Sequence, residues 1–203
     1  MSPWTWFGIW GIIAMAPIVH AWLRRTPISL AIGASLMLTY LFQATVKWAI
    51  DLNLFMQGAL IPAIAFEPEH LHRLISAAWL HADLLHLLGN VLVIILVGVP
   101  LEQRLGRGRF LTIYLIGVLG GNIGWTLANW ESWTLCIGAS GAAFGLLGCY
   151  LACWPRDEIE FPLILIRRWP VAWIALFKFA LEIMQYPTAT SNVAHLAHIT
   201  GFI

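Results

Sequence analysis

Four polar side chains stand in otherwise apolar segments of the chain, and together they have the composition of an acyl-transfer site. They are His86, Asn90, Ser140 and His198. A serine hydroxyl is a weak nucleophile until a neighbouring base removes its proton, and an imidazole that titrates near neutral pH suits that task. We therefore predict Ser140 as the nucleophile and His198 as the general base. No Asp or Glu lies beside His198 in the sequence to orient it, which favours a Ser–His dyad over a triad.

The other two polar residues are candidates for stabilising an oxyanion. His86 and Asn90 are four residues apart, so on a helix both side chains share one face. Together with the backbone N–H of Ser140 at a helix N-terminus, these two side chains are predicted to donate hydrogen bonds to the negative charge that develops during peptide hydrolysis. A hydrogen-bond clamp between helices is the alternative for this pair. His195, one turn before His198, is the alternative base.

The composition is that of an integral membrane protein. Of the 203 residues, 60% are hydrophobic and 10% are charged, and the mean hydropathy is +0.80. A soluble domain carries about 25% charged residues. The net charge of +1 gives no basic field that could hold nucleic acid, so we expect no nucleic acid as a partner. The hydrophobic composition makes membrane lipid the expected partner.

Apolar runs separated by Arg, Pro and Gly predict an all-α, polytopic membrane helix bundle. A helix needs about 20 mostly apolar residues to cross the hydrocarbon core of a bilayer. From residue 192 the chain has too few residues to cross a bilayer, so the last helix is either truncated, as we expect, or a short one that its partner helices tolerate. Residues 51–83 mix apolar and polar residues and are predicted to form a structured outer loop. The candidate spans are 4–23, 28–50, 84–101, 110–127, about 137–154, about 169–184, and one that begins near 192.

The distribution of Lys and Arg predicts the orientation of these spans. Placing the connection that holds Arg24 and Arg25 in the cytoplasm puts eight of the eleven basic residues there. The N-terminus and the loop 51–83 are then outside, and the four polar residues lie in the outer half of the membrane. The first span has no basic n-region and no small-residue cleavage site, so it is predicted to be a retained helix. Trp residues such as Trp48, Trp79 and Trp133 are predicted to be interfacial anchors.

Small residues indicate where the reactive helices approach each other. Gly141 and Gly145 give one small face, and Ala194, Ala197 and Gly201 give another on the last span. Small residues let membrane helices pack with their backbones close together. Such an approach is what a dyad shared by two helices requires.

At these residues the sequence resembles the rhomboid intramembrane serine proteases, over nearly the whole chain from Arg25. The serine motif of the family appears as Gly138-Ala139-Ser140-Gly141, the His-x-x-x-Asn pair as His86 and Asn90, and the last-helix motif as Ala197-His198-Ile199-Thr200-Gly201. The Gly-x-x-x-Glu-x-x-x-Gly marker appears as Gly98, Glu102 and Gly106. One departure is His72-Arg73, where the family often has Trp-Arg in the first outer loop.

This resemblance implies a fold and an activity. It implies a rhomboid-like protease core of six spans over residues 26–203, preceded by an extra transmembrane helix over residues 1–25. It assigns Ser140 as nucleophile, His198 as base and His86 with Asn90 as oxyanion support, and it places Phe144 where an aromatic ring stacks on the catalytic histidine. Single-pass transmembrane proteins are the expected substrates. We expect a multi-pass protein of a bacterial plasma (inner) membrane, with the active site toward the outer side.

Two other classes of function remain possible from the sequence. One is a catalytically silent rhomboid-like protein that binds transmembrane helices; the presence of both Ser140 and His198 argues against it. The other is a membrane haem or metal protein using His86 with His195 or His198, but no HExxH pair or His-rich span supports metal binding. We therefore expect no metal and no cofactor.

Overall fold

The protein is a bundle of apolar helices, as the computed structural model shows for residues 1–159, 169–170, 172–173, 175–176, 179–180 and 195–202. Within this part, four helices are long and apolar enough to cross a membrane: α1 (Pro3–Arg24), α2 (Ile28–Ile50), α5 (Leu84–Leu105) and α6 (Arg107–Ala128). Two shorter helices are α7 (Ser140–Cys153) and α9 (His195–Phe202). The predicted all-α, multi-pass membrane architecture is confirmed.

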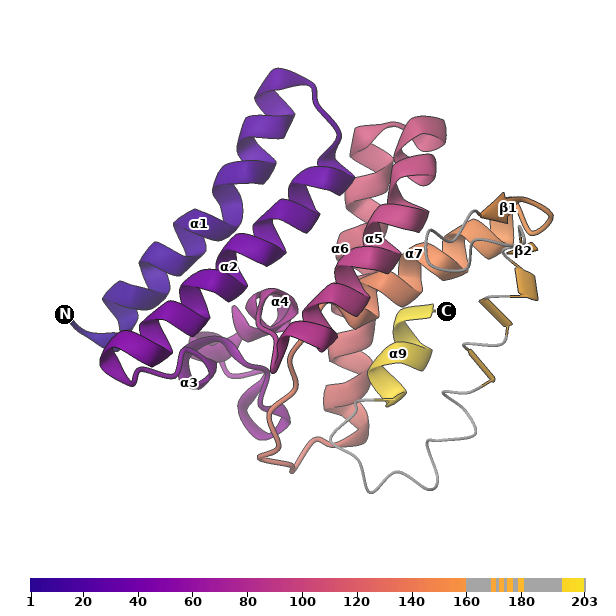
Figure 1. The fold of residues 1–203 in the computed structure, drawn as a ribbon. Helices are drawn as coiled ribbons and strands as arrows, with labels where there is room; N and C mark the ends of the chain where they lie inside the picture. Colours follow the sequence, from indigo (N-terminus) through magenta and orange to yellow (C-terminus); the bar gives the residue numbers. More distant parts are fainter. Residues whose placement is uncertain (160–168, 171, 174, 177–178, 181–194, 203) are drawn as a thin grey trace.

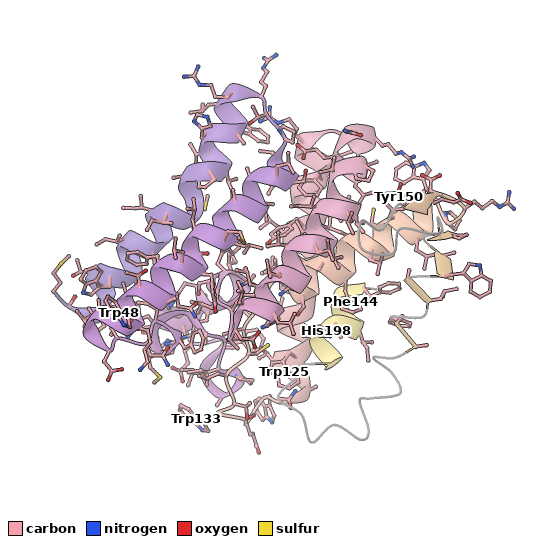
Figure 2. All side chains as sticks on the ribbon, viewed as in Figure 1. Trp48, Trp125, Trp133, Phe144, Tyr150 and His198 are labelled. Carbon is pink, nitrogen blue, oxygen red and sulfur yellow. The ribbon has the colours of Figure 1, made fainter. Side chains whose placement is uncertain are left out.

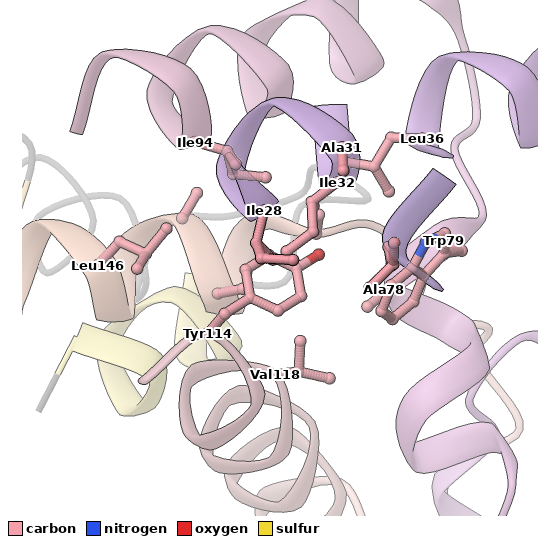
Figure 3. Packing of buried hydrophobic residues seen from close by; sticks show 14 of the residues in the cluster. Ile28, Ala31, Ile32, Leu36, Ala78, Trp79, Ile94, Tyr114, Val118 and Leu146 are labelled. Carbon is pink, nitrogen blue, oxygen red and sulfur yellow. The ribbon is translucent and has the colours of Figure 1, made fainter. Parts of the chain in front are cut away.

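The long helices fall into two groups that meet along α2. Figure 1 shows α1 and α2 side by side as one pair, with α5, α6, α7 and α9 gathered on the other side of α2. Tyr114 of α6 is fully buried where these groups meet, and apolar side chains from several helices surround it (Figure 3). Burial of such side chains holds the helices in fixed relative positions. The residues packed here include Ile28, Ile32, Ile94, Val118 and Leu146.

The start of α2 is capped by a residue from another helix. Pro27 precedes α2 and makes no side-chain cap. Instead the buried carboxylate of Glu102 accepts hydrogen bonds from the backbone N–H groups of Ile28 and Ser29, at 2.7 and 2.8 Å, and from the Ser29 hydroxyl at 2.7 Å. An anion at a helix N-terminus satisfies unpaired N–H groups and complements the helix dipole. Glu102 thereby joins the start of α2 to the end of α5, and both of these helix ends are predicted to lie on the cytoplasmic side.

Short helices fill the segment between α2 and α5. They are α3 (Phe55–Gly58), η1 (Pro62–Ile64), η2 (Pro68–His70), α4 (Arg73–Ser76) and η3 (Ala77–Trp79). The buried guanidinium of Arg73 donates to the carbonyls of Ala59 and Met56, both at 2.7 Å. The amide of Asn122 in α6 donates to the carbonyl of Leu74 at 2.9 Å. This segment is therefore attached to the helix bundle by hydrogen bonds.

The predicted span 137–154 is wrong at its start, because α7 begins only at Ser140. Before it, Cys136 pairs with Leu60 in an isolated β-bridge, and Gly138 has a φ of +116°. The β-bridge at Cys136 and the positive φ of Gly138 are both incompatible with helical backbone, so the helix begins only after them. The resulting helix of 14 residues is shorter than the prediction.

The predicted span 169–184 is also wrong at its start. Trp169–Pro170 form strand β2, which pairs antiparallel with β1 (Glu158–Ile159). Helix is present at 172–173, 175–176 and 179–180, and the rest of that span lies outside the described residues. The predicted start of the last span near 192 also lies outside them, and α9 is described from His195.

One predicted interfacial tryptophan is instead a core residue. Trp79 is only 6% exposed, and its indole N–H donates to the Ser35 hydroxyl at 2.8 Å. Trp48 and Trp133, by contrast, are 88% and 70% exposed, and Figure 2 shows both at the periphery. A buried indole needs a hydrogen-bond partner, which Ser35 supplies. The prediction for Trp79 as an interfacial anchor is therefore wrong.

Candidate active site

The structure brings the predicted nucleophile and the predicted base together where α7 contacts α9. Ser140 is the first residue of α7, and His198 lies in the middle of α9. The Ser140 hydroxyl oxygen is 2.8 Å from Nε2 of His198, within hydrogen-bond distance. In this arrangement the hydroxyl donates when Nε2 is unprotonated. The pair can thus transfer a proton from the hydroxyl to the imidazole.

A phenylalanine one turn beyond Ser140 fixes the plane of the imidazole. The rings of Phe144 and His198 are stacked, with centroids 4.7 Å apart and an angle of 7° between the planes. Figure 2 shows the two labelled side chains next to each other, one from α7 and one from α9. Stacking limits rotation of the histidine ring, so Nε2 is kept toward the serine. This is the contact that the family resemblance implied for Phe144.

Glycines allow α7 and α9 to approach closely enough for this contact. A Cβ atom added to Gly201 would lie only 2.5 Å from the carbonyl oxygen of Gly141. Helix α6 completes the contact, because a Cβ on Gly117 would lie 2.9 Å from the Ala142 Cα, and one on Gly121 would lie 2.8 Å from the Ala197 carbonyl oxygen. Of the small residues predicted to form this contact, Gly141, Gly145, Ala197 and Gly201 lie in it, and Ala194 lies outside the described residues. The glycines of α6 were not part of that prediction, although their spacing of four residues is a recognisable signal.

His86 and Asn90 lie at the start of α5, facing the backbone just before Ser140. Asp83 caps α5, since its carboxylate accepts from the backbone N–H of His86 at 2.8 Å. A Cβ added to Gly138 would lie 2.7 Å from Nε2 of His86 and 3.6 Å from Nδ2 of Asn90. Two side-chain nitrogens therefore face the same point beside Gly138, where the chain has no side chain of its own. This point is two residues from Ser140.

A second histidine, His81, belongs to this cluster. It is fully buried in the segment between η3 and α5, and its Nε2 is 3.0 Å from Nδ2 of Asn90 and 3.5 Å from the backbone nitrogen of Ala139. Its ring is 5.1 Å from that of His86. Burial, together with the nearby His86, lowers the pKa of His81 to about 3, so its imidazole is neutral near pH 7. No motif in the sequence singles out His81, and its position five residues before His86 is the available signal.

Two further predictions from the sequence concern the alternative base and metal binding. The side chain of the alternative base His195 lies outside the described residues, so the contact described above concerns His198 alone. Within the part of the chain that the structure describes, His, Cys, Asp and Glu form no group of three or more that can hold a metal ion. The described site contains the groups for nucleophilic and general-base chemistry.

Comparison with known proteins identifies the family. The model of the Rhomboid domain matches residues 68–203, about two thirds of the chain. The chain is 33% identical over 158 residues to "RHOMBOID-like protein 1" of Arabidopsis thaliana, covering 75% of this chain and 38% of the plant protein. The chain therefore belongs to the rhomboid family.

Two further relatives extend this comparison. "Rhomboid-related protein 1" of Caenorhabditis elegans is 35% identical over 138 residues, covering 64% of this chain and 37% of that protein. "Rhomboid-like protease 3" of Toxoplasma gondii is 37% identical over 86 residues, covering 42% of this chain and 32% of that protein. The match spans no more than 38% of the length of any of the three relatives. Activity, substrates and partners of the whole protein are therefore matters for proposal.

Proposed function

We propose that this protein is an intramembrane serine endopeptidase that cleaves transmembrane segments of single-pass membrane proteins. The observation that carries the proposal is the 2.8 Å contact between the Ser140 hydroxyl and Nε2 of His198 at the N-terminus of α7. The rhomboid family includes proteases and inactive members, and one relative is named a protease. An inactive member has no need to keep a nucleophile and a base within hydrogen-bond distance.

The first chemical step joins the serine to the substrate. Nε2 of His198 takes the hydroxyl proton while Oγ of Ser140 attacks the carbonyl carbon of the scissile peptide, giving a tetrahedral oxyanion. As that intermediate collapses, the protonated His198 gives its proton to the leaving amine. A water molecule then attacks the acyl-enzyme with His198 again acting as base, and Ser140 is regenerated. Each step uses the same imidazole, so its fixed orientation against Phe144 matters throughout.

The oxyanion requires donors that are already in position. His86 and Asn90 present nitrogens to the point beside Gly138, and Ser140 opens a helix whose first N–H groups lack intrahelical partners. Donors aimed at developing charge in a site shielded from water typically contribute 10²–10³ in rate each. The proposed function therefore assigns His86 and Asn90 to transition-state stabilisation and needs no cofactor.

The proposed site lies toward the outer side of the membrane, at the end of the bundle that also carries the segment 51–83. The chain is a multi-pass membrane protein. The three relatives compared above are eukaryotic proteins, so they lend no support to the bacterial plasma membrane expected from the sequence. The proposal therefore specifies the side of the membrane and leaves out the type of cell.

The test is labelling of the full chain in detergent micelles with a fluorophosphonate probe, which reacts with activated serines. Wild type should be labelled, while Ser140→Ala and His198→Ala should lose the signal because one lacks the nucleophile and the other the base. Ser132→Ala is the matched control, since Ser132 lies in the loop before α7 and its hydroxyl bonds only Thr134 among the described residues. Its labelling should equal that of wild type.

Cleavage of a transmembrane peptide, measured on the same proteins, should rank the variants in the same order. Ser140→Ala should reduce turnover by at least about 10³-fold, as expected for loss of a nucleophile. A folded wild type with neither labelling nor cleavage would contradict the proposal and favour a protein that binds transmembrane helices without cutting them.

A further inference from the structure

The inference concerns His81, which the reaction outlined above does not use. Its imidazole is fully buried behind the residues assigned to the oxyanion, and it contacts both Asn90 and the backbone of Ala139, the residue before the nucleophile. A buried imidazole in an apolar bundle needs specific partners, because an unpaired polar group there is destabilising. Among the described residues Nε2 has hydrogen-bond partners and Nδ1 has none, so the partners of Nε2 determine which nitrogen carries the proton.

The backbone N–H of Ala139 fixes the tautomer of His81. This group can only donate, and it points at Nε2 of His81 from 3.5 Å. Nε2 must therefore be the unprotonated acceptor, and the proton of the neutral ring lies on Nδ1. The same Nε2 atom is 3.0 Å from the side chain of Asn90.

The tautomer of His81 in turn fixes the amide of Asn90. An unprotonated Nε2 attracts the amide nitrogen of Asn90 and repels its oxygen, so the amide cannot rotate by 180° without losing this hydrogen bond. One amide proton is used by His81. The amide nitrogen also lies 3.6 Å from the position of a Cβ on Gly138, so the second proton is available on the side where the oxyanion is expected.

The position of His81 is itself held by α2. The side-chain amide of Gln43 donates to the backbone carbonyl of His81 at 2.8 Å. The indole of Trp79 is bonded to Ser35 on the same helix. Gln43 and Ser35, both on α2, therefore hold the backbone of the segment that carries His81 close to this helix.

We propose that His81 is a positioning residue of the oxyanion site. Its imidazole holds the Asn90 amide so that one N–H group of that amide points toward the space beside Gly138. This inference rests on the proposed protease function. It predicts that loss of the Nε2 acceptor lets the Asn90 amide turn its oxygen toward the oxyanion. Because that charge exists only in the transition state, turnover should fall while substrate binding is unchanged.

The test compares two amide substitutions of similar polarity. In His81→Gln the side-chain oxygen can reach the place of Nε2, whereas in His81→Asn the shorter chain reaches only as far as Nδ1. We expect kcat of His81→Gln within about threefold of wild type and kcat of His81→Asn lower by about 10²-fold, the cost typical of one lost oxyanion donor, with KM unchanged in both. Both variants keep a polar group in the pocket, which favours folding.

A double-mutant cycle separates positioning from a general loss of structure. Asn90→Ala should lower kcat about as much as His81→Asn, and the double variant should lose no more than Asn90→Ala alone, because His81 acts through Asn90. His72→Ala is the matched control: the ring nitrogens of this loop histidine lie 2.8 Å from the Gln57 carbonyl oxygen and 3.1 Å from that of Glu69, on a different segment from Asn90. It should change the unfolding temperature and leave kcat unchanged.

Three results would overturn the inference. Equal kcat values for His81→Gln and His81→Asn, or losses that multiply in the double variant, would contradict the positioning of Asn90 while Ser140-dependent cleavage by wild type still supports the protease. Absence of Ser140-dependent cleavage in folded wild type would contradict the proposed function and this inference together.

Discussion

At the scale of single residues, the start of α7 combines two requirements of acyl transfer. Ser140 must present its hydroxyl to a base, and the oxyanion formed on the substrate must meet donors close by. Gly138 satisfies the second requirement because its φ of +116° is accessible to glycine and because any side chain would collide with His86. The helix that follows satisfies the first by directing Ser140 toward His198.

The pKa of His81 predicts how stability depends on pH. Burial holds it at about 3 instead of 6.5, so between these values the unfolded chain binds a proton that the folded chain does not. The stabilisation is complete above pH 6.5 and is lost as the pH falls toward 3, by about 1 kcal/mol at pH 5.5. Of the groups facing His81, His86 lowers this pKa and Asp83 raises it.

The measurement is thermal unfolding of wild type and His81→Gln in detergent micelles from pH 7.5 to 4.5. Both proteins carry the same carboxylates, including Asp51 with its pKa lowered by Lys47, so the difference between their unfolding curves reports on His81. Wild type should lose stability more steeply than His81→Gln, which cannot titrate. Parallel unfolding curves for the two proteins would show that His81 is not held neutral by burial.

Sequence reasoning could find residues whose chemistry is unusual for their surroundings. Ser140, His198, His86 and Asn90 are polar residues in apolar runs, and their spacing matches a family pattern, so they could be proposed without a structure. The contact that defines His81 could not, because it joins a loop to α5 and to the residue before α7. Such a contact depends on how the loop folds, which no helical period describes.

At the scale of secondary-structure elements, the site depends on the contact between α6, α7 and α9. Backbone meets backbone in this contact, and a methyl group has no room at Gly117, Gly121, Gly141, Gly145 or Gly201. Without apolar side chains to deform, the distance between α7 and α9 is fixed by the backbones themselves. The distance between Ser140 and His198 is fixed with it.

We therefore expect Gly201→Ala to reduce activity by about 10²-fold, since a displacement of about 1 Å of a catalytic group has effects of that size. The added methyl group would lie 2.5 Å from the Gly141 carbonyl, so α9 must shift and carry His198 away from Ser140. Cleavage and fluorophosphonate labelling should both decline.

Gly108→Ala is the control for this substitution. Gly108 also lies in a helix, but a Cβ there meets no atom within 4 Å. Alanine should leave activity unchanged and raise stability by about 0.5–1 kcal/mol, because it restricts the unfolded chain. Equal activity of both variants would contradict the close-contact argument.

Helix boundaries show which features of the elements follow from sequence. The range predicted for α2, residues 28–50, agrees with the structure, because Pro27 and Asp51 bound one long apolar run. The start of α7 was predicted three residues early, since residues 137–139 are apolar or small but are not helical. Their conformation comes from pairing between Cys136 and Leu60, distant in sequence, so local composition does not reveal it.

At the scale of the whole molecule, the chain has two chemically different ends. Arg107 donates to the carbonyls of Ala21 and Trp22 at the end of α1, and Arg104 forms an ion pair with Asp157 beyond α7. These contacts gather the basic turns at one end. The start of α5, the start of α7 and the segment 51–83 lie at the other, where the site is (Figure 1). The separation of charge on which the predicted orientation depends is thus a property of the folded bundle.

The orientation predicts opposite accessibility of two cysteines to a membrane-impermeant thiol reagent. Glu67 is exposed, with 56% of its side chain accessible, so Glu67→Cys in a Cys153→Ser background should react in intact cells. The native Cys153 is exposed at the other end of α7 and should react only after permeabilisation, because the basic end is expected in the cytoplasm. Cys136 should stay unreactive in both conditions, since it is buried and burial raises its pKa to about 12. The reverse order of labelling would place Ser140 on the cytoplasmic side, and substrates would then have to be cut from that side.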